Sequence, residues 1–221
     1  FYKKDFQEIG GHDPMYAPQS KEDSDIFNRF RLNGVKFIQT WEGCVYHLCC
    51  RGSRFNPNIT TPGQDSNEWT KQNRKSERNF IRKWGSNVKH GEKLEPVVVP
   101  KFATEFRITN CTQEALEELE PYCQYMYVDC GFKNYLKKEQ KLTTIDISKK
   151  IQDISSVDRE SPKGNLVLEF DYSKLKSQEK IILKNINEIV VSNGIAGKAT
   201  AGNVSIDSRS HYSYERKLIH L

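Results

Sequence analysis

Strand and helix patterns alternate through the second half of the chain, and this order constrains the fold more than any other feature. Residues 101–109 and 124–130 have the β-rich composition of strands, and the segment 112–122 between them has a helical pattern with Thr112 as its N-cap. The same order recurs as a strand at 165–171, a helix at 177–194 and a strand at 203–208. We therefore predict an α/β fold with two β-α-β units in a small sandwich, for which a split arrangement is one option.

A polar segment rich in turn-forming residues, 86–96, separates this half from the first. The charge balance changes at the same place, because residues 51–93 contain ten Lys and Arg against four Asp and Glu, whereas 94–221 contain eighteen of each. Segments of this kind are typical of domain boundaries. We predict a first domain at 1–92 and a small α/β accessory domain at 93–221.

The first domain contains a short helix that we place at 21–32. Ser20 and Asp23 have the spacing of a capping box, and Asn33-Gly34 ends the pattern. Two β-rich runs follow, 35–41 and 43–49, which we predict to be strands packing on this helix. Its apolar face would consist of Ile26, Phe27 and Phe30.

A second, basic helix is predicted at 68–84, ending at Gly85, with Trp69, Phe80 and Trp84 at helical spacing. Two interpretations stay open. The basic residues form a solvated helix face, or the helix binds a nucleic acid or another polyanion and its rings stack on bases. The second is our alternative function for the chain, as a non-catalytic binding module. Rings that share one buried face would argue against it.

The six cysteines include no CxxC pair and no zinc-finger spacing with the histidines, so we expect reduced, mostly buried thiols in a cytoplasmic protein. The composition, with 36% hydrophobic and 11% aromatic residues, is sufficient for a core and excludes a wholly disordered chain. No apolar run approaches the roughly 20 residues that a membrane span needs, so we expect no membrane span.

Three acids crowd the start of the first helix: Glu22, Asp23 and Asp25. The helix dipole and free backbone N–H groups of a first turn favour ionised carboxylates. An ionised carboxylate on a rigid helix end is a suitable general base if a substrate hydroxyl can reach it. The alternative is structural: Asp23 closes the capping box and Glu22 complements the dipole.

The segments EIGGHD, EDSDIFNRFRLNGVKF, VYH and RGSRF follow one another in the first 55 residues or so. In this order they resemble the acceptor-side, C-terminal half of family 2 glycosyltransferases of the GT-A fold. In that family a GGFDE turn leads into an acidic ED motif that opens a helix of the type EDxDLxxRxxxxGYK, and a VYH strand and a basic loop follow. FIRKWG, 80–85, is similar to a late helix of these enzymes.

The resemblance implies transfer of a sugar from a nucleotide-sugar donor to a hydroxyl of a glycan acceptor, with inversion. It assigns Asp23 as the base that deprotonates the acceptor, Glu22 as the residue that orients it or binds acceptor, and Asp25 as support for the helix start. It also implies a divalent metal, Mg or Mn, near His47. The alternative for His47 is a hydrogen-bonded histidine in the core or at its rim.

Further binding residues are implied around this pair of acids. Arg51 and Arg54 would neutralise the leaving diphosphate, or are ordinary loop charges. The other candidates are Gly10 and Gly11, which would let the backbone turn close to the acceptor, and Tyr16 and Trp41, which would stack on sugars, with a core position as the alternative for Trp41.

The sequence departs from the family in three places. His12 stands where an aromatic residue is usual, and PMYAPQSK lengthens the approach to the acids. The donor-binding half, with its Asp-x-Asp metal motif, does not precede Asp23, so we expect the chain as given to be a fragment that is inactive alone. In the second domain Asp129, Asp171 and Asp207 follow strands, where they are either ligand-site residues or turn formers.

Overall fold

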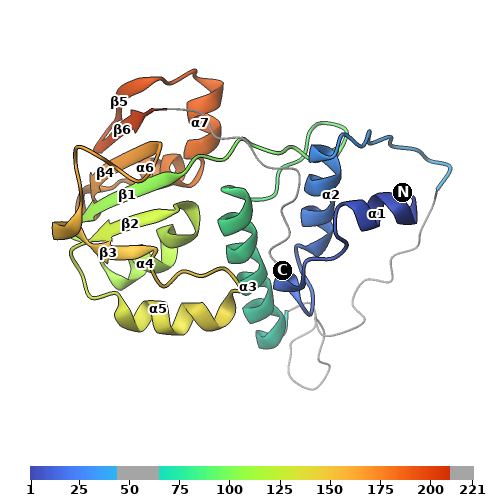
Figure 1. Ribbon diagram of the computed structural model, residues 1–221, viewed down its shortest axis with the longest axis horizontal. Helices are drawn as coiled ribbons and strands as arrows, with labels where there is room; N and C mark the ends of the chain where they lie inside the picture. Colours follow the sequence, from blue (N-terminus) through green and yellow to red (C-terminus); the bar gives the residue numbers. More distant parts are fainter. Residues whose placement is uncertain (44–64, 210–221) are drawn as a thin grey trace.

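The computed structural model describes residues 1–43 and 65–209 (Figure 1). The first part contains the helices α1 (Lys3–Glu8) and α2 (Glu22–Leu32), with a 3-10 turn η1 (Pro14–Tyr16) between them. The long helix α3 (Asn67–Trp84) lies between these helices and a sheet (Figure 1). Both α2 and α3 confirm the predicted helices, to within a residue at each end.

The sheet has six strands in the order β3-β2-β1-β4-β6-β5. The first four of these are parallel to one another, and β6 is antiparallel to both β4 and β5. The mixed α/β class is therefore confirmed. The strands are β1 (Thr104–Thr109), β2 (Tyr125–Val128), β3 (Ile151–Asp153), β4 (Leu166–Asp171), β5 (Gly197–Ala201) and β6 (Val204–Ser208).

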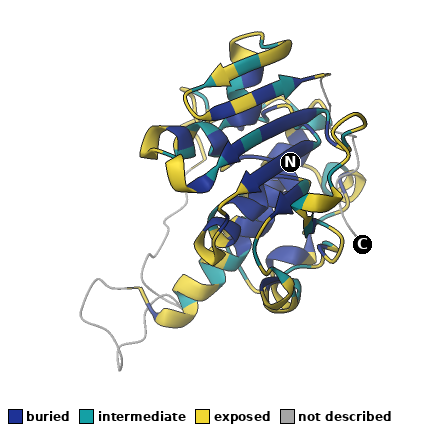
Figure 2. Cartoon of the chain, turned by 90° about the vertical axis from the view of Figure 1, so that its left-hand side faces the viewer, coloured by how far each residue is buried: buried dark blue, intermediate teal, exposed yellow. Residues whose placement is uncertain are grey.

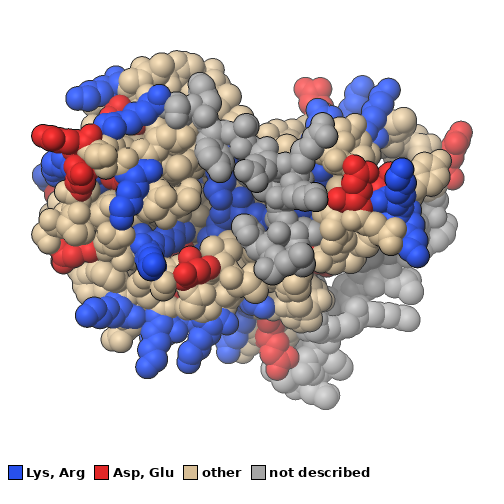
Figure 3. Space-filling view, in the orientation of Figure 1, with Lys and Arg blue, Asp and Glu red and all other residues tan. Residues whose placement is uncertain are grey.

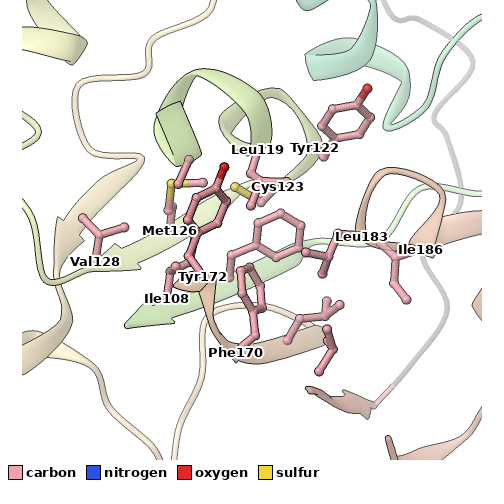
Figure 4. Close-up of a cluster of buried hydrophobic side chains, with 14 of the residues drawn as sticks. Ile108, Leu119, Tyr122, Cys123, Met126, Val128, Phe170, Tyr172, Leu183 and Ile186 are labelled. Atoms are coloured by element: carbon pink, nitrogen blue, oxygen red, sulfur yellow. The ribbon is translucent and has the colours of Figure 1, made fainter. Parts of the chain in front are cut away.

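The helices of this unit cover one face of the sheet. Alternate strand residues such as Ile108, Met126 and Val128 are fully buried and belong to one core with Leu119 and Leu183 from the helices (Figure 4). The helices are α4 (Gln113–Leu119), α5 (Lys133–Glu139), α6 (Ser177–Lys184) and α7 (Ile186–Ser192), and short 3-10 turns follow several elements: η2 (Glu120–Tyr122), η3 (Gln140–Leu142), η4 (Ile154–Ser156) and η5 (Tyr172–Lys174).

The other face of the sheet is polar. From β1 to β3 the chain moves toward one edge of the sheet, and from β3 to β4 it moves back past β2 and β1. A right-handed crossover in this reverse direction passes over the face opposite the helices. There Gly164 N donates to Glu105 Oε2 at 3.0 Å. This connection buries Glu105 and Arg107. Figure 2 shows the central strands buried and the edge strand β5 exposed or half-buried, while Val204, Ile206 and Ser208 of β6 are buried.

Several predicted elements need correction. Residues 35–41 form no strand, and most of the run 43–49 lies outside the described residues. The capping box is also wrong, because α2 has Lys21 at its N-cap without a side-chain hydrogen bond. The strands β3 and β5 and the helix α5 were not predicted. Thr112 does cap α4, since its side chain accepts a hydrogen bond from Ala115 N at 3.1 Å.

The predicted helix at 177–194 is divided at Asn185, whose backbone leaves the helical region with φ −116° and ψ 15°. The break places Asn187 of α7 against the end of α3. Asn187 Nδ2 donates to the carbonyl of Gly85 at 2.7 Å, and its Oδ1 accepts from Phe102 N at 3.2 Å. Gly85 ends α3 with φ +73°, and a Cβ there would lie 2.6 Å from Asn187 Nδ2.

A buried ion network, which we call the sheet-side network, joins α3 to the sheet unit. Arg78 Nε lies 2.7 Å from Glu139 Oε1, and both Arg82 Nη2 (2.5 Å) and Lys150 Nζ (2.6 Å) contact Glu120. Burial opposes ionisation of Glu120, but Lys150 and Arg82 hold its pKa well below its usual range. These contacts cross the expected boundary near residue 93, and the division at 92/93 stays a prediction.

Candidate active site at the start of helix α2

The acids at the start of α2 occupy different environments. Asp23 is exposed to solvent in the first turn of the helix. Glu22 is half-buried, and its Oε2 is buried without a hydrogen-bond partner among the described residues. Asp25 is fully buried. Only Asp23 therefore presents its carboxylate to a molecule from solution without rearrangement.

The backbone before these acids is strained. Ser20 and Lys21 have φ of 81° and 72°, a left-handed conformation that costs non-glycine residues about 1 kcal/mol or more each. Side chains of α3 hold this segment in place. Ser20 Oγ donates to Asn73 Oδ1 at 2.7 Å, and Gln72 Nε2 donates to the carbonyl of Gln19 at 2.7 Å. Strain that the surroundings impose in this way is characteristic of functional sites.

Asp25 is the centre of a second buried network, which we call the acid-side network. Its Oδ1 accepts from Trp84 Nε1 at 2.9 Å and lies 2.8 Å from Lys83 Nζ, while its Oδ2 accepts from Arg29 Nε at 2.8 Å. Lys83 Nζ also lies 2.7 Å from Asp13 Oδ2. This network fixes α2 against α3, so the predicted support role of Asp25 has a structural basis.

Tyr16 belongs to the same network and does not form a sugar-binding surface. Its side chain is 1% exposed, and its hydroxyl donates to Asp25 Oδ1 at 3.3 Å. Burial and the two neighbouring carboxylates raise the pKa of Tyr16 well above its usual value, so the hydroxyl keeps its proton. The predicted stacking role of Tyr16 is therefore wrong.

The glycine turn is tied to this network through Arg29. Gly10 and Gly11 have φ of 88° and 76°, which only glycine adopts without strain. Arg29 Nη1 donates to the carbonyl of Ile9 at 2.6 Å, directly before the turn. His12 packs edge-on against Phe6, with ring centroids 5.3 Å apart, so it does occupy an aromatic contact.

The remaining candidates are Trp41, which is exposed, and three residues that lie outside the described part of the chain. Trp41 is 95% exposed, which rules out the core position and leaves sugar stacking as a prediction. His47, Arg51 and Arg54 lie outside the described residues, so their metal and diphosphate roles also stay predictions.

Two important residues were missed, Asp13 and Lys83. Asp13 belongs to the GGHD segment, and this motif could have marked it as a site residue. Lys83 is indistinguishable in the sequence from the other charges of the basic helix. Both residues are 3% exposed, and Lys83 links Asp13 to Asp25.

The basic helix is largely committed to internal contacts. Phe80 and Trp84 are 2% exposed, so they cannot stack on bases, and Arg78 and Arg82 belong to the sheet-side network. Figure 3 shows that the exposed cations gather elsewhere, along the lower edge over α5, where the exposed lysines include Lys133, Lys137, Lys138 and Lys141.

The acids at the C-terminal ends of β2 and β4 accept hydrogen bonds from nearby segments of the chain. Asp129 accepts hydrogen bonds from Asn110 N at 2.7 Å and Cys111 N at 2.8 Å. Asp171 accepts from Ser173 N and from Asn110 Nδ2, both at 3.0 Å. The hydrogen bonds from Ser173 and Asn110 lower the pKa of Asp171 to about 2. The contact with Ser173 therefore supports turn formation for Asp171, whereas Asp129 binds the backbone of the segment that follows β1.

Within residues 1–43 and 65–209, no three His, Cys, Asp or Glu side chains are grouped so that they could hold a metal ion. The three cysteines in these ranges, Cys111, Cys123 and Cys130, are free thiols, and the first two are buried. No helix of the described chain is long and apolar enough to cross a membrane. Comparison of the chain with protein-family models, curated proteins and solved structures gave no match.

Proposed function

We propose that the start of α2 is the acceptor side of a glycosyltransferase site of the GT-A type, in which Asp23 is the catalytic base. The observation that carries this proposal is the contrast between Asp23 and Asp25. Asp25 anchors the helix inside the acid-side network, and Asp23, two residues earlier, extends its carboxylate into solvent from the same first turn. A base needs this combination of a fixed backbone and an accessible oxygen.

In the proposed reaction Asp23 accepts the proton of an acceptor hydroxyl. The oxygen of that hydroxyl forms a bond to the anomeric carbon of the donor sugar from the side opposite the diphosphate. The bond from the anomeric carbon to the diphosphate oxygen breaks, and its electron pair leaves with the nucleoside diphosphate. The configuration of the sugar is inverted, because a single displacement takes place.

Glu22 and the strained turn would position the acceptor. The Oε2 of Glu22 is buried and has no hydrogen-bond partner among the described residues, so it would accept from an acceptor hydroxyl only after a rearrangement that exposes it. The resemblance also implies a divalent metal at the diphosphate, but the described side chains supply no ligand set for it. The steps that these residues support therefore concern the acceptor proton alone.

The test compares Asp23→Asn with a matched control, Glu8→Gln, which neutralises an exposed carboxylate on α1. Both are made in the longest natural polypeptide that contains these residues, and transfer is assayed from a panel of UDP- and GDP-sugars to glycan acceptors. We expect Asp23→Asn to lower kcat by about 10²- to 10⁴-fold, the range typical of a lost general base, with an unchanged thermal midpoint. Glu8→Gln should retain its activity.

Two results would count against the proposal. Transfer at the wild-type rate in Asp23→Asn would remove Asp23 from the base role. No transfer by the unsubstituted protein with any donor and acceptor of the panel would overturn the glycosyltransferase function itself. Retention of the donor's anomeric configuration in the product would exclude the single displacement.

A further inference from the structure

A hollow of about 250 Å³ lies on the polar face of the sheet, on the side away from the helices. It is distant in the chain from the acids of α2, and nothing in the proposed reaction uses it. Its lining combines four basic side chains with two carboxylates and a hydroxyl: Arg107, Arg159, Val167, Glu169, Lys198, Ser205, Asp207 and Arg209.

Strand register explains why this surface is hollowed. Arg107, Glu169 and Ser205 face one another across β1, β4 and β6. The next row on the same face places Val167 opposite Asp207, with Lys198 beyond it on β5. The small side chains of Val167 and Ser205 form the floor, and the long charged side chains around them form the walls.

Two of the walls are fixed by ion pairs. Glu169 receives two parallel hydrogen bonds from Arg159, at 2.9 and 3.0 Å. Arg107, whose side chain is 6% exposed, donates from Nε to the buried Glu105 at 2.8 Å and from Nη2 to the carbonyl of Asp158 at 3.3 Å. Its Nη1 has only Glu169 Oε2 near it, at 4.0 Å, and makes no hydrogen bond within the described chain. A preorganised guanidinium donor is thus available at the wall of the hollow.

The opposite wall supplies further free groups. Arg209 Nε donates to Asp207 Oδ2 at 3.1 Å, which leaves Asp207 Oδ1 and the terminal nitrogens of Arg209 without a hydrogen bond to the described residues. Lys198 is exposed and likewise unpaired there. With Glu105 behind Arg107 included, four basic side chains face three acidic ones, so the site carries one net positive charge.

We propose that this hollow binds a saccharide unit that carries a carboxylate. The ligand carboxylate fits the cationic ends of Arg107, Lys198 and Arg209, since guanidinium groups match carboxylate geometry. Sugar hydroxyls can donate to Asp207 Oδ1 and exchange hydrogen bonds with Ser205 Oγ. A plain anion would leave Asp207 Oδ1 without a hydrogen-bond donor, and a neutral sugar would leave the net positive charge of the site uncompensated. The choice of a sugar rests on the proposed glycosyltransferase function, whose acceptor glycan this module would hold.

The test is an NMR titration of the 221-residue chain, labelled with ¹⁵N, with glucuronate, glucose and inorganic phosphate. The double variant Lys198→Gln, Arg209→Gln removes two of the cations that would bind the carboxylate, and Lys137→Gln on α5 is the control on a distant exposed lysine. We expect saturable shifts with glucuronate confined to β1, β4, β5 and β6. The double variant should bind at least tenfold more weakly, and Lys137→Gln should bind as the wild type does. Glucose and phosphate should each bind at least tenfold more weakly than glucuronate.

Each other outcome overturns the inference. No saturation with glucuronate removes the site. Equal binding of phosphate makes it a general anion site, and equal binding of glucose removes the role of the charge. Transfer assays separate this inference from the proposed function. If the unsubstituted protein transfers sugar but does not bind glucuronate, the saccharide site in the hollow is refuted alone. If it binds glucuronate but transfers no sugar, the proposed glycosyltransferase function is refuted alone.

Discussion

The two buried ion networks of this protein both use α3, but only the acid-side network also contains a pair within one helix, Asp25 and Arg29. The acid-side network joins Asp13, Asp25 and Arg29, which are close in sequence, to Lys83. The sheet-side network consists entirely of contacts between distant segments, since Arg78 and Arg82 meet Glu120 and Glu139. The acid-side network fixes α2 and the segment before it to α3, and the sheet-side network fastens α3 to the sheet unit.

This difference indicates different roles for buried charge. Replacing a buried ion pair by apolar residues is often neutral for stability, but removing one partner leaves an uncompensated charge and costs about 3–5 kcal/mol. In the sheet-side network one carboxylate, Glu120, serves three cations. In the acid-side network one cation, Lys83, serves two carboxylates. Single substitutions at Glu120 and Lys83 should therefore lower the free energy of unfolding by different amounts.

The largest effect is expected from Glu120→Gln. The variant keeps the shape of the side chain but leaves Arg78 and Arg82 with Glu139 as their remaining carboxylate, and Lys150 with none among the described residues. We expect the free energy of unfolding, measured in urea, to fall by about 3–5 kcal/mol. The control is Arg74→Gln, which breaks the exposed ion pair between Arg74 of α3 and Glu117 of α4. This substitution should cost under about 1 kcal/mol. Equal losses in the two variants would show that burial of the sheet-side network adds nothing.

A somewhat smaller loss is expected from Lys83→Met, about 3 kcal/mol, at the lower end of the same range. Asp13 loses its cation, but Asp25 keeps Arg29 as a partner. The exposed Lys71→Met on the same helix should change stability by less than about 0.5 kcal/mol. If Lys83→Met is more destabilising than Glu120→Gln, then the loss of one cation from the acid-side network costs more than the loss of one carboxylate from the sheet-side network, contrary to this prediction.

Lys101 lies between the networks and should report on both through pH. Burial, with Lys150 and Lys83 nearby, lowers the pKa of Lys101 to about 8 from its model-compound value of 10.5. Between these pH values the unfolded chain binds a proton that the folded chain does not, so the stability contributed by this group rises with pH. The difference in unfolding free energy between the wild type and Lys101→Met should therefore shift in favour of the wild type from pH 8 to 10.5. A pH-independent difference would show that Lys101 titrates normally in the folded protein.

The smallest effect is expected at the strained turn. Lys21→Gly relieves a left-handed conformation at φ 72° and should raise the thermal midpoint, by an amount that corresponds to about 0.5–1 kcal/mol. Glycine at Lys71, inside α3, should instead cost about 1 kcal/mol. Destabilisation by Lys21→Gly would mean that the side chain of Lys21 makes a contact worth more than the strain.

Sequence patterns were sufficient for elements that carry their own signals. The long amphipathic pattern located α3, and Thr112 located the start of α4. The short strands β3 and β5 have no such pattern, since Gly197-Lys-Ala-Thr-Ala201 has low β propensity and forms a strand by pairing with β6. The same limit applies to Ser20, whose hydroxyl contacts Asn73, 53 residues away, instead of capping α2.

The sequence identified the residues of the candidate site but not which of them are buried and which are accessible. The ED pair and the glycine turn were visible as motifs, whereas the burial of Asp25 and Tyr16 depends on α3, whose docking no local pattern encodes. The hollow on the sheet was not predictable either, because it arises from the register that aligns Val167 with Asp207 and Glu169 with Ser205.

The contact between Gly85 and Asn187 has a consequence for how this sequence can vary. Any side chain at position 85 would collide with the amide of Asn187, and that amide satisfies both the last turn of α3 and the chain entering β1. A change at one position is tolerated only with a compensating change at the other. Among relatives of this chain, positions 85 and 187 should therefore covary, and a relative with a larger residue at 85 should have a smaller one at 187.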